Sequence, residues 1–215
     1  MKILNQNNNI SFKSTPLHRL RIPKADGIGS VSAFFSKLDP CNDEDRVAIE
    51  TIKRTWSDSL ATDNFCIYFS KPPDSSTYYC IELADNTPLA RRIVGLVKLS
   101  DQNQNLHLDA LVIRDDCQSH NTQCKFRNVG KITMGAIFNE ARKLRYQSLS
   151  LDPLRTALNF YERIFKEASI SHDISRRPPY RWNIRFGDFG RYIRYIQEKF
   201  SINFAQPITE TTAQL

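Results

Sequence analysis

The sequence predicts an α/β fold in which a mixed, mainly antiparallel central sheet is flanked by helices. The first observation is a series of short β-type runs between residues 64 and 113, separated by turn-forming clusters. The second is a helix–strand–helix series between residues 129 and 168. The third is size, because 215 residues suffice for one sizeable α/β domain, and 40% apolar with 25% charged residues is the balance of a globular protein.

The N-terminal part begins with a polar, Asn-rich stretch, residues 1–15, which we expect to be a flexible tail. A helical pattern lies within residues 30–59, after the acidic run Asp43–Asp45. Its apolar positions are Val47, Ile49, Ile52 and Trp56.

An antiparallel meander is predicted next. Its four strands are short runs of β-branched, aromatic and other apolar residues, bounded by clusters such as Lys71–Ser76 and Asp101–Asn105. The predicted strands are Asn64–Ser70, Thr77–Leu83, Arg92–Leu99 and Leu106–Ile113.

Two amphipathic helices with a strand between them follow a polar loop. The first helix carries a stripe of apolar residues with a 3.6-residue period, and Gln147–Leu151 alternates as a strand does. The second helix is predicted to start at Asp152-Pro153, an N-cap acid followed by a first-turn proline. The stripes are Val129, Ile132, Ala136, Ile137, Ala141 and Leu144, then Leu154, Leu158, Tyr161, Phe165 and Ala168.

We expect a single domain over residues 16–200. It includes a basic C-terminal extension from about residue 169, read as a strand and then a helix from about Gly187. Residues 201–215 are predicted to be a second flexible tail.

Charge and cysteine content narrow the function classes. Lys and Arg number 30 against 23 Asp and Glu, so the net charge of +7 favours anionic partners such as a phosphorylated cofactor, nucleic acid or an acidic protein surface. Five scattered cysteines indicate reduced thiols and a cytoplasmic location rather than a disulfide framework. The sequence has no apolar stretch long enough to span a membrane and no secretory signal, so we expect no membrane partner.

A basic loop that ends in a glycine leads into the first of the two helices. It reads Lys125-Phe126-Arg127-Asn128-Val129-Gly130. A turn that opens a helix offers several backbone N–H groups to a pyrophosphate, and the helix dipole adds a favourable potential. Small or αL-tolerant residues at 128 and 130 would keep that approach open, and Lys125, Arg127 and Lys131 can neutralise the phosphates. The alternative is an ordinary helix with a solvated basic first turn.

This loop and the second of the two helices resemble two signatures of the GNAT acyltransferase superfamily. The first signature, Gln/Arg-x-x-Gly-x-Gly/Ala, matches residues 125–130 with Lys125 at its head and Asn128 in place of the central glycine. A rival register puts Arg127 first and Gly130 in the middle. The second signature, Ala-x-x-Phe-Tyr-Glu, matches Ala157–Glu162. Together they cover roughly residues 77–168 with the strands before them.

The resemblance implies a GNAT-like fold and an N-acyltransferase that uses acetyl-CoA or a related acyl-CoA. The cofactor would lie between two splayed strands, with backbone groups of Leu111, Val112 and Ile113 along the pantetheine arm. Its phosphates would lie on Lys125, Arg127, Asn128, Val129, Gly130 and Lys131.

The resemblance also implies a general acid, Tyr161, which would protonate the departing thiolate. The alternative for Tyr161 is a half-buried core aromatic. For the base, Asp109 is the first choice, with His107 on the same strand and Glu82 on an earlier strand as further candidates. Strand-face polar residues are also often simply exposed.

Two further clusters have alternative interpretations. Cys117-x2-His120-x3-Cys124 resembles a zinc-ligand set but lacks a fourth ligand, so we expect a polar loop and no metal. The segment from Arg176 to Tyr195 interleaves arginines with Tyr and Trp, a pattern typical either of RNA-binding surfaces or of a solvated basic face.

The acceptor amine of the implied reaction would belong to a protein, a small molecule or an aminoacylated RNA. The rival function is a non-catalytic module that binds nucleic acid or protein through this basic surface.

Overall fold

A computed structural model describes residues 14–56, 60–71, 76–118, 121–175 and 181–204. Their framework is one eight-stranded sheet in the order β1-β2-β3-β4-β5-β6-β8-β7. All neighbouring strands are antiparallel except β5 and β6, which are parallel. The strands are β1 (Thr15–Pro23), β2 (Ser30–Leu38), β3 (Ser76–Leu83), β4 (Ile93–Gln102), β5 (Asn105–Ile113), β6 (Ser148–Leu151), β7 (Asp173–Ile174) and β8 (Trp182–Arg185).

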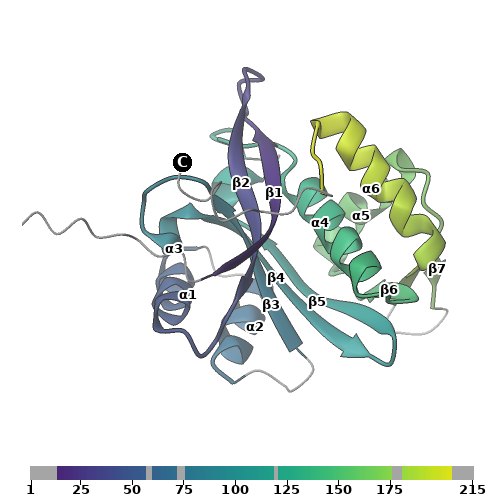
Figure 1. The fold of residues 1–215 in the computed structure, drawn as a ribbon, viewed down its shortest axis with the longest axis horizontal. Helices are drawn as coiled ribbons and strands as arrows, with labels where there is room; N and C mark the ends of the chain where they lie inside the picture. The colour runs from purple at the N-terminus through teal and green to yellow at the C-terminus, as the bar shows by residue number, and fades with distance from the viewer. Residues whose placement is uncertain (1–13, 57–59, 72–75, 119–120, 176–180, 205–215) are drawn as a thin grey trace, which may run out of the picture.

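Helices cover both faces of the sheet, as Figure 1 shows. On one face, α1 (Asp43–Thr55), α2 (Leu60–Phe69) and α3 (Leu89–Arg92) enclose a small core with side chains of β3 and β4. On the other face, α4 (Val129–Lys143), α5 (Leu158–Glu167) and α6 (Phe186–Phe200) enclose the larger core. None of the described helices has the length and apolar character needed to cross a bilayer.

The parallel strands β5 and β6 separate halfway along β5. Their pairing runs only from Asn105–Ser148 to Leu108–Leu151, so the second half of β5 has no partner on that side among the described residues. A register shift in the pairing of β4 with β5 leaves Asp109 of β5 as an extra residue, a β-bulge, next to the point where β5 and β6 separate. The splay expected from the resemblance is therefore present, and the bulge marks its beginning.

Several sequence predictions are confirmed with small boundary changes. Three of the four predicted meander strands correspond to β3, β4 and β5, and the predicted helix–strand pair corresponds to α4 and β6. The strand and helix of the basic extension correspond to β8 and α6. The helical pattern after Asp43 is α1, which Asn42 caps by accepting hydrogen bonds from the amides of Glu44 and Asp45.

The predicted strand Asn64–Ser70 is wrong, because this segment belongs to helix α2. Its buried residues are Thr62, Phe65, Cys66 and Phe69, a helical spacing of three, one and three. The β-type composition of the segment therefore reflects burial of aromatic side chains rather than an extended backbone.

The start of the second predicted helix is also wrong, since α5 begins at Leu158 rather than at Asp152-Pro153. A short 3₁₀ turn, Arg155–Ala157, precedes it. Asp152 instead follows β6, where its carboxylate forms an ion pair with Arg181. The acid thus belongs to the end of the strand.

The β1–β2 hairpin was not predicted from the sequence. Alternate residues of β1 (His18, Leu20 and Ile22) are buried, and Gly27 and Gly29 in the turn have φ values of +79° and +81°. The ordered chain also runs past α6, because Ile202 and Phe204 are buried. Both residues fall in the predicted second tail, whereas the predicted tail residues 1–13 and 205–215 lie outside the described residues.

Candidate functional site

A cavity of about 590 Å³ lies where β5 and β6 separate. The unpaired half of β5 supplies Leu111 and Ile113, and the start of α4 supplies residues 128–131. The opposite wall comes from α5 and the turn before it, including Phe160 and Tyr161. Six of the nine predicted cofactor residues line this cavity: Leu111, Ile113, Asn128, Val129, Gly130 and Lys131. The size is within the range of small-molecule sites.

The other three predicted residues do not line the cavity. The Val112 side chain belongs to the small core on the opposite sheet face, so only its backbone can contribute. Lys125 is 70% exposed and lies 3.7 Å from Asp116. Arg127 is held through its backbone, since its amide donates to the Pro23 carbonyl at 2.9 Å.

The start of α4 has the features of an anion site. Asn128 is the N-cap, its backbone is left-handed (φ 62°, ψ 16°), and its side chain makes no capping hydrogen bond. The amide of Ile132 donates to the Asn128 carbonyl at 3.0 Å, the first bond of the helix. The amides of residues 129–131 therefore have no partner within the helix and lie at its positive end. This geometry favours the register in which Asn128 replaces the central glycine.

Gly130 is required for close packing rather than for backbone freedom. Its φ is not positive, whereas a Cβ at this position would lie 3.1 Å from Phe160 Cζ and 3.3 Å from Phe160 Cε2. Of the two properties expected at residues 128 and 130, left-handed backbone is thus found at Asn128 and small size is used at Gly130. The small residue lets the first turn of α4 approach α5 across the cavity.

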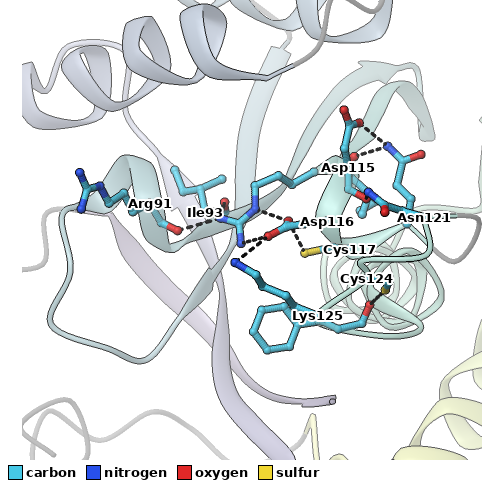
Figure 2. Close-up of polar contacts among 12 residues, drawn as sticks. Arg91, Ile93, Asp115, Asp116, Cys117, Asn121, Cys124 and Lys125 are labelled. Atoms are coloured by element: carbon cyan, nitrogen blue, oxygen red, sulfur yellow. Dashed lines mark hydrogen bonds and ion pairs between the residues drawn. The ribbon is translucent and has the colours of Figure 1, made fainter. Parts of the chain in front are cut away.

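The loop before α4 is anchored by a charged cluster, shown in Figure 2. Arg114 Nε donates to Asp116 at 2.6 Å, and its Nη1 donates to the carbonyls of Arg91 and Ile93. The Lys125 amide donates to the Asp116 carbonyl at 2.7 Å. Partial burial by itself raises the pKa of the Asp116 carboxyl. The hydrogen bonds and charge of Arg114 outweigh this effect and hold that pKa below its usual range. The loop is therefore fixed to β4 and α3.

The β1–β2 hairpin anchors the same loop from the other side. Ala25 donates to the Lys125 carbonyl at 2.9 Å, and Lys24 and Phe126 form an isolated bridge. These contacts join residues about 100 positions apart, so no local pattern predicts them. The Asp26-Gly27 pair was the available signal for the turn.

Cys117 and Cys124 each make a local hydrogen bond in this loop. The Cys117 thiol donates to Asp116 Oδ1 at 3.2 Å, and the Cys124 thiol donates to the Phe126 carbonyl at 2.7 Å (Figure 2). The described residues contain no group of three or more metal-ligating side chains, and His120 lies outside them. Both thiols therefore have local structural roles.

Tyr161 lines the cavity from α5 and packs against Phe160, Phe165 and Trp182. The residue is 7% exposed, and within the described part of the chain its hydroxyl makes no hydrogen bond. Burial raises the pKa of this phenol well above its ordinary value. Tyr161 is therefore a protonated donor at neutral pH.

The three base candidates have different environments. Glu82 is fully buried under α1 and α3, where Ser14 and Ser36 donate to its Oε1 and Arg92 lies 3.5 Å from its Oε2. None of the three candidates lines the cavity, and Glu82 is in addition enclosed by these partners in the core under α1 and α3.

His107 and Asp109 lie instead where β5 and β6 separate. Asp109 is exposed on the bulge. His107 is buried, its Nδ1 lies 2.8 Å from Ser150 Oγ, and its Nε2 lies 3.9 Å from Asp152 Oδ2. Burial lowers the pKa of His107 despite the opposing charges of Asp109 and Asp152. His107 is therefore a neutral imidazole at pH 7.

The aromatic residues of the basic C-terminal segment are mostly core residues. Trp182 and Tyr192 are buried, which removes them as stacking platforms for bases. Three of the arginines are paired with acids: Arg181 with Asp152, Arg185 with Asp173 and Arg191 with Asp188. The predicted residues 176–180 lie outside the described residues.

We compared the sequence and the structure of this chain with those of known proteins. No family model and no curated protein matches the sequence. Among solved structures, a presumed acetyltransferase from Exiguobacterium sp. 255-15 matches with a TM-score of 0.50 and 11% identity, covering 74% of this chain and 96% of the other. The GNAT domain of PAT from S. lividans matches with a TM-score of 0.50 and 13% identity, covering 78% and 96%. The chain has the GNAT fold.

Within the GNAT fold, the cavity occupies the splay between the two parallel strands and the start of the helix that joins them. Each alignment covers nearly the whole of the matched structure and leaves about a quarter of this chain unaligned. At 11–13% identity the similarity establishes the fold, and the chemistry has to be argued from the site.

Proposed function

We propose that this chain is an acyl-CoA-dependent N-acyltransferase that transfers an acetyl group from acetyl-CoA to an amine. One observation supports this most strongly. The unpaired half of β5, the unbonded amides at the start of α4 and the Tyr161 side chain all face one cavity. A strand edge, an anion site and a proton donor are the three parts that a thioester of a nucleotide cofactor requires.

The residues fit such a ligand in order along the cavity. The backbone of Leu111–Ile113 can pair with the amide groups of the pantetheine arm, because β6 does not occupy that edge. The amides of residues 129–131 can bind the pyrophosphate. Lys125 and Arg127 lie on the adjacent loop and add positive potential without lining the cavity.

The chemistry of the bound thioester is an activated acyl group with a thiolate leaving group. Tyr161 is the proton donor for that thiolate, since burial keeps its phenol protonated and its hydroxyl makes no hydrogen bond to the described residues. On the acceptor side, Asp109 attracts the incoming ammonium through its exposed carboxylate. His107, neutral because it is buried, accepts the proton, and the charges of Asp109 and Asp152 then stabilise the imidazolium.

The acceptor is an amine of a protein, a small molecule or an aminoacylated RNA. The rival function, a non-catalytic GNAT-fold module that binds nucleic acid or protein through its basic C-terminal surface, is disfavoured because Trp182, Phe189 and Tyr192 in that segment are buried. Transfer in a reduced, cytoplasmic setting is consistent with the free thiols of the described cysteines.

The test is acetyl transfer from labelled acetyl-CoA to a panel of small amines, peptides and aminoacylated RNA. Transfer to at least one class is expected, and His107→Gln should lower its rate about 10²-fold with acetyl-CoA affinity unchanged. Acetyl-CoA binding without transfer to any acceptor would support the binding module instead.

A further inference from the structure

The cavity extends along α5 away from Tyr161. Its wall includes Arg163 and then Glu167, which lies six residues beyond Tyr161, or about 9 Å along the helix axis. Lys131, from the first turn of α4, lines the same part. If the acyl group lies at Tyr161 and the pyrophosphate at the amides of residues 129–131, this part of the cavity receives the nucleotide end of the ligand.

Glu167 organises the cations around this end. Lys131 Nζ donates to both Glu167 oxygens, at 2.8 and 2.7 Å. From α6, Lys199 Nζ donates to Glu167 Oε2 at 3.1 Å and to the Tyr195 hydroxyl at 2.8 Å, and that hydroxyl donates to Glu167 in turn. Three helices thus meet at one carboxylate beside the cavity.

The group carries an excess of positive charge. Lys131, Arg163 and Lys199 are three cations against the single carboxylate of Glu167. Partial burial by itself raises the pKa of the Glu167 carboxyl. Hydrogen bonds from Lys131, Tyr195 and Lys199 outweigh this effect and lower that pKa to about 2. Glu167 therefore stays ionised and holds the lysines in place, while the net charge of the group remains attractive to a phosphate.

We infer that Lys131, Arg163 and Lys199, arranged around Glu167, form a subsite for the ribose phosphate monoester of coenzyme A. The inference rests on the proposed function and adds a role for α6. From the sequence alone, the basic C-terminal segment is either a surface of the RNA-binding type or a solvated basic face. Tyr195 and Lys199 instead connect that segment to the cofactor side, while Arg181 lies at Asp152, near the acceptor side.

The experiment compares the binding of coenzyme A with that of dephospho-coenzyme A, which lacks only this phosphate. Calorimetric titration of the full chain should show at least tenfold tighter binding of coenzyme A at low salt. In Arg163→Gln and Lys199→Gln the ratio of the two dissociation constants should fall severalfold toward one, because each variant removes one charge-assisted contact. Both side chains are exposed at least in part, so folding should be preserved.

Two neighbouring residues provide matched controls. Lys166 is exposed on α5 outside the cavity, and Arg191 is exposed on α6 in an ion pair with Asp188. Lys166→Gln and Arg191→Gln should leave the ratio unchanged. Equal binding of the two ligands to the unmodified protein, or a ratio that Arg163→Gln and Lys199→Gln leave intact, would overturn the inference without affecting the proposed function. Failure of both ligands to bind would refute the proposed function itself.

Discussion

Replacing Tyr161 with Phe separates the proposed proton donor from its packing role. The ring keeps its contacts with Phe160, Phe165 and Trp182, and the lost hydroxyl leaves no partner unsatisfied among the described residues. The free energy of unfolding should therefore change by less than about 1 kcal/mol. The affinity for acetyl-CoA should be nearly unchanged because the cavity keeps its shape.

The rate of acetyl transfer should fall about 10²-fold, the lower end of what a general acid contributes, since a thiolate leaves fairly well without a proton. This corresponds to about 2.7 kcal/mol of transition-state stabilisation. Single-turnover transfer from acetyl-CoA at several pH values is the assay, alongside direct titration of cofactor binding. Because burial raises the pKa of Tyr161, the loss should persist across the neutral range.

Tyr146→Phe is the matched control for this change. Tyr146 also has a raised pKa, but it lies at the end of α4 outside the cavity. Loss of the Tyr146 hydroxyl should leave the rate of acetyl transfer intact. An unchanged rate in Tyr161→Phe would refute the assignment of the acid, and a parallel loss of rate and affinity would show that the hydroxyl supports the bound geometry instead.

Three other predictions follow from the same contacts. Gly130→Leu should weaken acetyl-CoA binding at least tenfold while the protein still folds, because the side chain meets Phe160 and fills the approach to the α4 amides; unchanged affinity by calorimetry in a folded variant would contradict this. Arg181→Ser should lower the turnover of the acceptor and leave the affinity for acetyl-CoA intact, because Arg181 holds Asp152 beside His107. Equal losses of turnover and of affinity would argue against an acceptor-side role. Burial raises the pKa of Asp45 from 3.8 to about 6, so ionisation of Asp45 lowers the free energy of unfolding as the pH rises from about 4 to 6. Asp45→Asn should remove this pH-dependent loss of stability, which amounts to at most about 3 kcal/mol. The measurement compares urea unfolding curves of the two proteins across this pH range, and the same pH dependence in both would contradict the prediction.

The parts of the site that could be predicted from the sequence are those built within one segment. The residues at the start of α4 and the Phe160-Tyr161 pair follow from local motifs, because a helix start and a helix face are fixed by neighbouring residues. The strand β5 follows from its β-type composition between turn clusters, whereas its separation from β6 was an implication of the family resemblance.

The parts that could not be predicted depend on contacts between distant segments. Glu167 meets Lys131 across 36 positions and Lys199 across 32, and nothing in the local pattern of α5 marks it as a ligand for either. The hairpin contact between Pro23 and Arg127 is of the same kind. In α2, apolar and aromatic residues suited to either element were assigned by composition, and the helical spacing of the buried ones decided the outcome.

The most direct test of the central claim is thermal unfolding with and without acetyl-CoA, with ATP as a control for non-specific anion binding to this basic chain. At 100 times its dissociation constant, acetyl-CoA should stabilise the folded protein by about 2.7 kcal/mol, and Gly130→Leu should lose most of that gain at the same concentration. An unfolding temperature that does not respond to millimolar acetyl-CoA, or that responds equally to ATP, would contradict the assignment of the cavity as an acyl-CoA site.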